Sequence, residues 1–379
     1  QERFGKAAPP LQDGARRVVP EETFARLLCL ERRRAERSQR QFLVMLADLG
    51  ELLVTASEQN GALLNKIAGA ILSATRETDI IGWYEQGFVL GAILTEIPPS
   101  NLPGAVNAVF TKVNKALLGF LSLSQINSLR FTFHLFPEEP DTQSPGGMPA
   151  DLKLYPDLLE RDRSKILPRI VKRSMDLSAT LALLIFLSPA MAVIAAAIKL
   201  TSRGPVFFRQ KRQGQYGRAF TFFKFRSMYV NNDPAVHQEY VKQFISGTAS
   251  QNPSGENGGL SVYKLTDDPR ITPCGRFLRR TSLDELPQLF NVLAGQMSLV
   301  GPRPPLPYEL ASYEAWHRRR LLEAKPGITG LWQVSGRSKT KFDEMVRLDL
   351  RYAKTWSLAL DLKILLRTPR AVFSGEGAY

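Results

Sequence analysis

An uncharged apolar stretch, Leu177–Ile198, constrains this chain more than any other feature of its sequence. A straight helix over these 22 residues spans about 33 Å, which is enough to cross a lipid bilayer. Pro189 lies near its middle, where it removes a backbone donor and predicts a bend. Ser188 beside it can bond to a carbonyl that the proline leaves without a donor. The stretch therefore predicts a bent helix.

Positive charge flanks both ends of this stretch, whereas a helix that crosses a membrane usually has it on one side. The flanking residues are Lys165, Arg169, Lys172 and Arg173 before it and Lys199 and Arg203 after it. We expect a re-entrant helix over about residues 174–200 that enters one leaflet and returns, with arms of about 15–18 Å and both flanks on the cytoplasmic face. A kinked helix that crosses fully and a buried core helix are the alternatives.

The charge divides the chain into a neutral and a basic part. At about 100–200 residues per domain, 379 residues suggest two domains. Residues 1–150 hold 15 Lys and Arg against 16 Asp and Glu, whereas residues 151–379 hold 35 against 20. The basic part is suited to an anionic partner, which could be nucleic acid, a phospholipid surface or a phosphorylated substrate.

Few side chains are available for thiol, zinc or triad chemistry. Two cysteines, Cys29 and Cys274, lie far apart, and only three histidines occur. The sequence therefore argues against zinc sites, a disulfide scaffold and a Ser-His-Asp triad, and it indicates a reducing compartment. The first 40 residues contain no apolar run that could serve as a signal peptide.

The pattern of strands, helices and turns gives an outline of the domains. Residues 1–22 form a polar tail, and residues 23–140 alternate between strand and helix patterns, which is typical of an α+β domain. Two β-rich runs around Glu85-Gln86-Gly87 predict a hairpin. A Pro- and Gly-rich segment opens a linker over residues 141–164. Residues 165–379 then form a helix-rich α/β domain with a loose stretch within residues 231–261.

Two adjacent carboxylates, Asp284 and Glu285, lie in the most polar part of the second domain. Thr281 or Ser282 is placed to cap a helix that begins near residue 283, which puts both carboxylates in its first turn. Carboxylates at that position are common as partners of the helix dipole. By itself, the pair is therefore not evidence of catalysis.

Arginines surround this carboxylate pair in the sequence. Arg276, Arg279 and Arg280 precede it, and Arg303 follows it within the motif Gly-Pro-Arg-Pro. The prolines stiffen the backbone around Arg303, which suits bidentate capture of a phosphate. Adjacent carboxylates among arginines also suit Mg²⁺, which takes one or two carboxylates together with substrate phosphates. A carboxylate can in addition attack phosphorus and form a covalent phosphoryl intermediate.

Two further segments offer phosphate contacts. Lys224 and Arg226 in FTFFKFRSM are two residues apart, so on a strand they share a face, although such a face can equally be solvated. The segment KPGITGLWQVSGRS contains three glycines that permit close approach to a ligand, and Arg337 lies near its end. It matches neither the P-loop nor the dinucleotide fingerprint.

These motifs together resemble those of the bacterial sugar transferases, the monotopic polyprenyl-phosphate phosphoglycosyl transferases. The similarity covers about Lys165–Tyr379 and rests on KR(x)₂D before the Ser-Pro helix, FKFRSM, TDDPRITPCGRFLRRTSLDELPQLFNVLAGQMSLVGPRP, KPGITGLWQVSGR and the C-terminal tail. It implies transfer of a sugar 1-phosphate from a UDP-sugar to undecaprenyl phosphate or another polyprenyl phosphate. UMP is released, and the product is the first membrane-bound precursor of a surface polysaccharide or exopolysaccharide.

The resemblance also implies roles for residues that match the family motifs. Asp284 would be the nucleophile that forms a phosphosugar-aspartate, Glu285 would assist with the metal or accept a proton, and Mg²⁺ would bridge carboxylate and diphosphate. Phosphate contacts would come from Arg303 and from Lys224, Arg226, Arg279 and Arg337. At the bacterial inner membrane, Ser188-Pro189 would break the re-entrant helix, and Lys172-Arg173 would lie at the membrane surface.

Residues 23–140 resemble a degenerate diguanylate-cyclase (GGDEF) domain. The signature position reads Trp83-Tyr84-Glu85-Gln86-Gly87-Phe88 and lacks the expected glycines and carboxylates, so GTP cyclisation is not expected. The implied role is regulation or dimerisation, and we expect a homodimer.

Two other functions stay open from the residues alone. A basic membrane scaffold or nucleic-acid-binding regulator would use the charge of residues 151–379 as its footprint. The basic residues lie beside prolines and carboxylates instead of along one recognition helix, so we expect no nucleic-acid partner. A metal-dependent hydrolase of polyprenyl diphosphates would use similar carboxylates and arginines.

Overall fold

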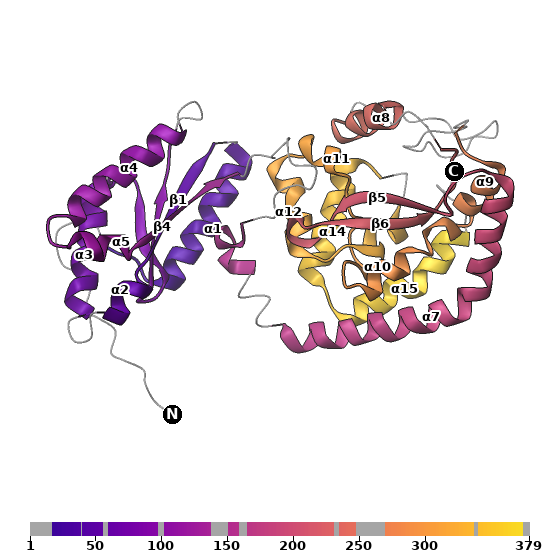
Figure 1. Cartoon of the computed structure of the whole chain (residues 1–379), viewed down its shortest axis with the longest axis horizontal. Coiled ribbons are helices and arrows are strands. Elements are labelled where there is room, and N and C mark those ends of the chain that lie inside the picture. The colour runs from indigo at the N-terminus through magenta and orange to yellow at the C-terminus, as the bar shows by residue number, and fades with distance from the viewer. Residues whose placement is uncertain are drawn as a thin grey trace. The chain divides into compact units, whose positions relative to one another are not determined.

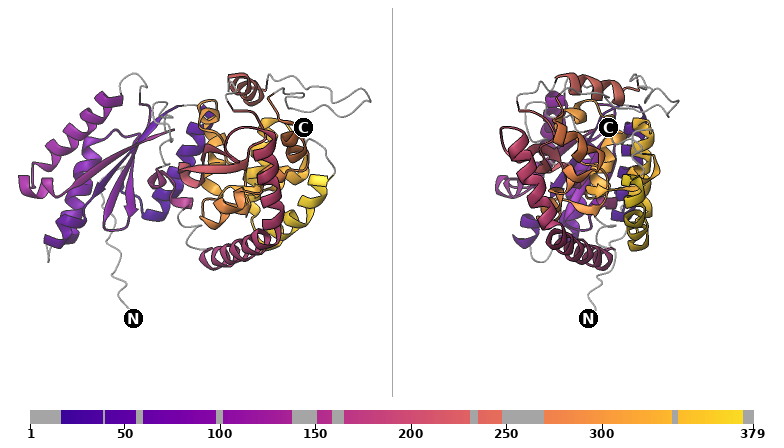
Figure 2. Two further views of the ribbon diagram at one scale, coloured as in Figure 1. Left: turned by 45° about the vertical axis from the view of Figure 1, so that its right-hand side comes forward. Right: turned by 90° about the vertical axis from the view of Figure 1, so that its right-hand side faces the viewer.

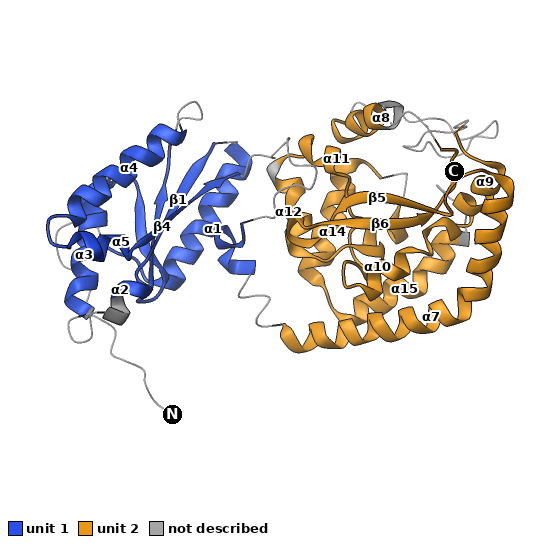
Figure 3. Ribbon diagram, viewed as in Figure 1, with its two compact units in different colours: residues 1–139, 151–160 blue, residues 140–150, 161–379 orange. Residues whose placement is uncertain are grey.

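The computed structural model of the chain describes residues 17–38, 40–55, 60–97, 102–137, 151–158, 165–230, 235–247, 270–336 and 340–373. The chain forms two compact units, which are coloured separately in Figure 3. The first unit comprises residues 1–139 and 151–160, and the second comprises residues 140–150 and 161–379. Residues 151–158, which the sequence analysis assigned to a linker, therefore belong to the first unit.

The first unit is a mixed α+β domain, as predicted. Its elements are α1 (Glu21–Ser38), β1 (Phe42–Asp48), α2 (Gly50–Thr55), α3 (Asn60–Ala74), β2 (Ile80–Glu85), β3 (Val89–Leu94), α4 (Leu102–Leu117), α5 (Leu123–Asn127) and β4 (Arg130–Phe136). The strands form an antiparallel sheet in the order β2-β3-β1-β4. β1, α3 and β2 thus form a split β-α-β unit with β3 between its strands. The predicted hairpin is confirmed as β2 and β3.

Helices cover both faces of this sheet. Leu43 and Met45 of β1 belong to one apolar cluster with buried residues of α3 and α4. On the opposite face, Phe24 of α1 lies so close to Gly91 that a Cβ there would stand 2.4 Å from its ring. Figure 2 shows α3 and α4 on one side of the sheet and α1 on the other. Because helices cover both faces of the sheet, every residue of β1 except its last, Asp48, is buried.

The second unit is rich in helices and contains two short pairs of strands. Its elements are α7 (Ile166–Thr201), β5 (Phe207–Gln213), β6 (Ala219–Phe225), α8 (Ala235–Ile245), α9 (Pro273–Arg280), α10 (Gln288–Leu293), β7 (Ser298–Val300), α11 (Pro307–Ala311), α12 (Ala315–Glu323), β8 (Gly327–Thr329), α13 (Leu331–Ser335), α14 (Phe342–Thr355) and α15 (Leu358–Phe373). β5 and β6 pair antiparallel, and β7 and β8 pair parallel. One core cluster joins side chains from β6, α10, β7, α14 and α15.

The apolar stretch lies in α7, which runs along the second unit and then turns, as Figure 1 shows. Pro189 is inside the helix, and Ser188 Oγ donates to the Ile185 carbonyl at 2.9 Å. That carbonyl is the one that the N–H of residue 189 would bond in a regular helix, so the predicted local repair is present. Only 17% of the most apolar part of α7 is buried, which does not fit a buried core helix. By length and composition α7 could cross a membrane.

Candidate active site

The two carboxylates singled out in the sequence share one ammonium group in the structure. Lys224 Nζ lies 2.7 Å from Glu285 Oε1 and 3.4 Å from Asp284 Oδ2. The side chain of Asp284 is 8% exposed and that of Glu285 is 38% exposed. The site is therefore a buried carboxylate beside a more accessible one, with a lysine from a different part of the chain bridging them.

Strand β6 brings Lys224 to this position. Phe222 and Lys224 are two residues apart, so they lie on the same face of the strand. The Phe222 ring is buried in the core, with Lys224 Nζ 5.9 Å and the Arg212 guanidinium 4.4 Å from its centre. The aromatic face can stabilise both cations where little water is available. The alternation of side chains along β6 thus places Lys224 beside Phe222, whose buried ring fixes this face of the strand in the core.

The backbone in front of the carboxylates differs from the prediction. Asp284 and Glu285 lie in a short 3-10 helix, Leu283–Glu285, and Ser282 before it is left-handed with φ 56° and makes no side-chain cap. Thr281 Oγ1 bonds back to carbonyls of α9, so it does not cap the following turn either. The predicted cap is therefore wrong. A left-handed serine is a strained conformation, and here it joins α9 to the turn that carries Asp284.

The pKa values of the two carboxyl groups are shifted in opposite directions. Burial raises the pKa of Asp284 above its usual value, and the charge of Glu285 adds to this, while Lys224 and Arg279 oppose it. Burial also acts to raise the pKa of Glu285, but Lys224 and the nearby Arg303 and Arg212 overcome it and lower the pKa to about 2. Glu285 is thus ionised at neutral pH. At Asp284, by contrast, burial outweighs the lowering of the pKa by Lys224 and Arg279.

Arg303 in the loop Pro302–Pro305 lies within electrostatic range of this site. Its side chain is exposed, and among the described residues no hydrogen bond or ion pair of its guanidinium is present. Its charge is close enough to help lower the pKa of Glu285. An exposed arginine near the ionised Glu285 has donors to offer to a phosphate, and the binding of a phosphate by Arg303 stays a prediction.

Arg212 in β5 is a site residue that the sequence analysis missed. It is buried, donates to the Pro304 carbonyl at 2.6 Å, and lies within electrostatic range of both Glu285 and Arg303. Burial and the charge of Arg303 lower the pKa of Arg212 to about 10, so it stays positive at neutral pH. The segment FFRQKRQ gives no signal for this role, because burial of one arginine among several depends on tertiary packing.

The remaining predicted phosphate contacts divide into three cases. Arg279 is near enough to Asp284 to lower its pKa. Arg226 is buried and donates to the carbonyls of Arg203 and Ser202 at 2.7 and 2.8 Å, so it holds the C-terminal end of α7 and is not brought to the carboxylate pair. Arg337 lies outside the described residues.

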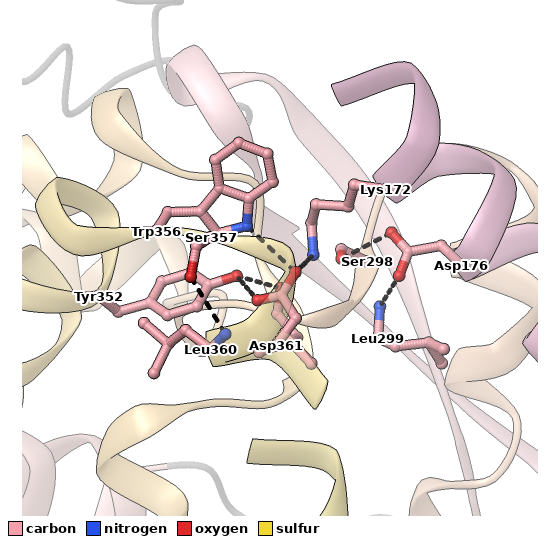
Figure 4. A network of polar contacts seen from close by, with 10 residues as sticks. Lys172, Asp176, Ser298, Leu299, Tyr352, Trp356, Ser357, Leu360 and Asp361 are labelled. Carbon is pink, nitrogen blue, oxygen red and sulfur yellow. Dashed lines mark hydrogen bonds and ion pairs between the residues drawn. The ribbon is translucent and has the colours of Figure 1, made fainter. Parts of the chain in front are cut away.

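The basic pair before the apolar stretch, Lys172 and Arg173, makes polar contacts inside the second unit. Lys172 Nζ lies 2.6 Å from Oδ2 of the buried Asp361, and Arg173 donates to two carbonyls at the end of α10. Figure 4 shows Tyr352 and Trp356 bonded to the same carboxylate of Asp361. In the same view, Asp176 accepts hydrogen bonds from Ser298 and Leu299 of β7. These contacts fix the first half of α7 to the rest of the unit.

The described residues contain no cluster of three or more metal-ligating side chains. A Mg²⁺ ion that takes one or two carboxylates and completes its shell with phosphate oxygens and water does not require one. Asp284 and Glu285 supply two hard oxygen donors of that kind on one short turn. The pair is therefore chemically suited to Mg²⁺ in the presence of a diphosphate substrate.

Comparison with known proteins shows the family to which this chain is related. The model of the family "Bacterial sugar transferase" matches residues 167–375, which is more than half of the chain. Galactosyl transferase CpsE of Streptococcus agalactiae is 43% identical over 210 residues, covering 55% of this chain and 43% of that protein. Undecaprenyl-phosphate galactose phosphotransferase of Salmonella typhimurium is 41% identical over 221 residues, covering 58% of this chain and 44% of that protein.

A third relative is matched over most of its length. Exopolysaccharide production protein ExoY of Sinorhizobium fredii is 40% identical over 210 residues, covering 55% of this chain and 88% of that protein. The matched region thus spans less than half of the first two relatives but nearly all of ExoY. Among solved structures, a DGC protein from Thermotoga maritima matches at 15% identity and a TM-score of 0.26, covering 32% of this chain and 84% of that one. On the family match and the ExoY similarity, this chain belongs to the bacterial sugar transferase family.

Proposed function

We propose that this protein transfers a sugar 1-phosphate from a UDP-sugar to undecaprenyl phosphate and releases UMP. Relatives named as undecaprenyl-phosphate galactose phosphotransferase and UDP-glucose:undecaprenyl-phosphate glucose-1-phosphate transferase support this reaction class. The name of ExoY supports a role in starting exopolysaccharide synthesis. The single observation that carries the proposal is the buried Asp284 beside Lys224 and Glu285, with the exposed Arg303 within electrostatic reach of Glu285.

The proposed reaction has two displacements at phosphorus. In the first, a carboxylate oxygen of Asp284 bonds to the sugar-bearing phosphorus, the bond from that phosphorus to the bridging oxygen breaks, and UMP leaves with the bridging oxygen. In the second, a phosphate oxygen of undecaprenyl phosphate attacks the same phosphorus, and the acyl-phosphate bond to Asp284 breaks. The carboxylate is regenerated, and no oxidant or reductant is needed.

Positive charge around the carboxylates supports this chemistry. Lys224 holds Asp284 and Glu285 together and opposes the effect of burial on the pKa of Asp284. Arg303 would bind the diphosphate and stabilise the charge that develops on the leaving phosphate, while the buried Arg212 holds the loop that carries it. Mg²⁺ held by the carboxylates would supply further charge neutralisation when bound. Glu285, ionised at neutral pH, would hold the metal or accept a proton.

We further propose that α7 is a re-entrant helix at the cytoplasmic face of the inner membrane. Its apolar side chains are exposed on both sides of the bend, for example Ile185 and Phe186 before Pro189 and Val193 after it. Exposed apolar surface of this extent is typical of contact with lipid. Polar contacts at both ends, through Lys172 and Arg226, tie both arms to the same unit. The first unit is proposed to serve in regulation or homodimer formation.

The reaction is tested with the full chain reconstituted in lipid nanodiscs containing undecaprenyl phosphate. A panel of UDP-sugars with Mg²⁺ is supplied, and both UMP and lipid-linked sugar are measured. We expect equal amounts of the two products from one or a few sugars. Asp284→Asn should lower the rate by at least about 10³-fold, whereas the matched control Glu344→Gln, at an exposed carboxylate of α14, should keep it.

Other products would contradict the proposal. Release of free phosphate from polyprenyl diphosphates, without a lipid-linked sugar, would instead indicate that the protein is a metal-dependent hydrolase of these lipids. Salt-sensitive binding of DNA without UMP release would indicate the nucleic-acid-binding regulator.

A further inference from the structure

The loop Pro302–Pro305 is held from several sides through its carbonyl groups. The Pro302 carbonyl accepts from Gly327 N–H at 2.9 Å, and the Pro305 carbonyl accepts from Gln213 N–H at 3.0 Å. Three of the four loop residues are prolines, so the loop has a single backbone N–H of its own. Its position therefore depends mainly on donors that other elements supply.

Two buried arginines provide the remaining donors. Arg212 Nη1 donates to the Pro304 carbonyl at 2.6 Å, and Arg320 Nη2 of α12 donates to the Arg303 carbonyl at 3.3 Å. Each of the four successive carbonyls thus has a donor, and those donors come from β5, α12 and β8. Gly301, directly before the loop, packs tightly on the chain that leads into β8, because a Cβ there would lie 2.2 Å from the Lys325 carbonyl and 2.9 Å from the Gly327 nitrogen.

Arg320 has a counter-ion that keeps it in place. Its side chain is 1% exposed, and Nη1 lies 3.2 Å from Oδ2 of Asp349, which is also 1% exposed. Nη2 additionally donates to the Tyr313 hydroxyl at 3.1 Å. A buried ion pair of this kind contributes little net stability compared with apolar side chains of similar size. Net stability therefore does not explain why this ion pair lies beneath the exposed Arg303.

We propose that Arg320, fixed by Asp349, and Arg212 are positioning residues that act through the loop carbonyls to aim Arg303 at the diphosphate. The inference rests on the proposed function, because it assumes that Arg303 binds the phosphates. No hydrogen bond or ion pair of the Arg303 guanidinium is present among the residues that the structure describes, so the loop backbone determines from which point this exposed side chain can reach a phosphate. Loss of either donor would let the loop shift, and a displacement of about 1 Å at a reacting group can cost about 100-fold in rate.

A merely structural role and a positioning role are separated by a double-mutant cycle with Arg303. The first variant is Arg320→Met with Asp349→Leu, which removes both buried charges together and leaves neither unpaired. The second is Arg212→Lys, which keeps the buried charge but shortens the donor that reaches Pro304. Each is combined with Arg303→Ala, and kcat/KM for the UDP-sugar is measured in nanodiscs. Arg347→Met, an exposed arginine of α14, is the control.

We expect both variants to keep a thermal midpoint near that of the unchanged protein and to lose about 10-fold in kcat/KM. In the Arg303→Ala background, the same changes should cost less than about 2-fold, because the group that they position is gone. Equal losses in both backgrounds would overturn the positioning role while leaving the proposed function intact. A normal kcat/KM for Arg303→Ala alone would instead overturn the role of Arg303 in the proposed function and this inference with it.

Discussion

The ammonium group of Lys172 is held inside the second unit by the buried carboxylate of Asp361, and removing it should destabilise the protein. Lys172→Met leaves Asp361, which is 1% exposed, without its counter-ion. Breaking a buried pair by removing one partner costs about 3–5 kcal/mol. Tyr352 and Trp356 still donate to Asp361 at 2.7 and 3.1 Å, so we expect the lower end, about 3 kcal/mol. For a unit of this size, that lowers the thermal midpoint by about 6–12 °C.

The assay is thermal unfolding of the full chain in nanodiscs, followed by intrinsic fluorescence at one heating rate. Lys363→Met is the matched control, because Lys363 is an exposed lysine of α15 for which no ion pair is present among the described residues. The control should shift the midpoint by less than about 2 °C, since exposed charges contribute little. Asp361→Leu added to Lys172→Met should recover much of the loss. A midpoint for Lys172→Met within about 2 °C of the unchanged protein would refute the reasoning.

Two further predictions concern pH and the membrane. Burial lowers the pKa of His317 below its usual 6.5, and its Nδ1 accepts from the Glu314 N–H at 3.0 Å, so protonation there breaks a bond. A histidine with a lowered folded pKa contributes stability that is present above pH 6.5 and lost as the pH falls below it. Asp349, whose pKa burial raises to about 7, acts in the opposite direction over this range, so the contribution of His317 is read from a comparison of variants. The thermal midpoint of the unchanged protein should fall relative to that of His317→Gln between pH 7 and 5.5; a constant difference would disprove it. For α7, single cysteines introduced at Lys165 and Arg203 in a chain without Cys29 and Cys274 should react with an impermeant maleimide only from the cytoplasmic side, whereas labelling from opposite sides would show a full crossing.

Local patterns were sufficient where a feature depends on neighbours in the sequence. The hairpin of β2 and β3 follows from two apolar runs around a polar turn, and the bend of α7 follows from Pro189. The bond from Ser188 to Ile185 is equally local, because both lie within one helical turn. These predictions are confirmed. The sequence was sufficient for them because their physical causes act over only a few residues.

Features that depend on tertiary packing could not be predicted in this way. Lys224 and Arg226 look equivalent in the sequence, but β6 ends at Phe225, so one side chain reaches the carboxylates and the other holds the end of α7. Arg212 and Arg320 are ordinary basic residues in the sequence, and only the structure shows that both are buried and donate to carbonyls of the loop. The cap proposed for Ser282 failed because the backbone there is left-handed.

The covalent attachment of sugar phosphate to Asp284 is the central chemical claim, and mass spectrometry of a quenched reaction tests it most directly. The protein is mixed with its UDP-sugar and Mg²⁺ without undecaprenyl phosphate, quenched and digested. We predict that the peptide containing Asp284 gains the mass of one sugar phosphate, that undecaprenyl phosphate removes it, and that Asp284→Asn never carries it. Turnover with the adduct on another residue, or with no adduct at all, would contradict the account.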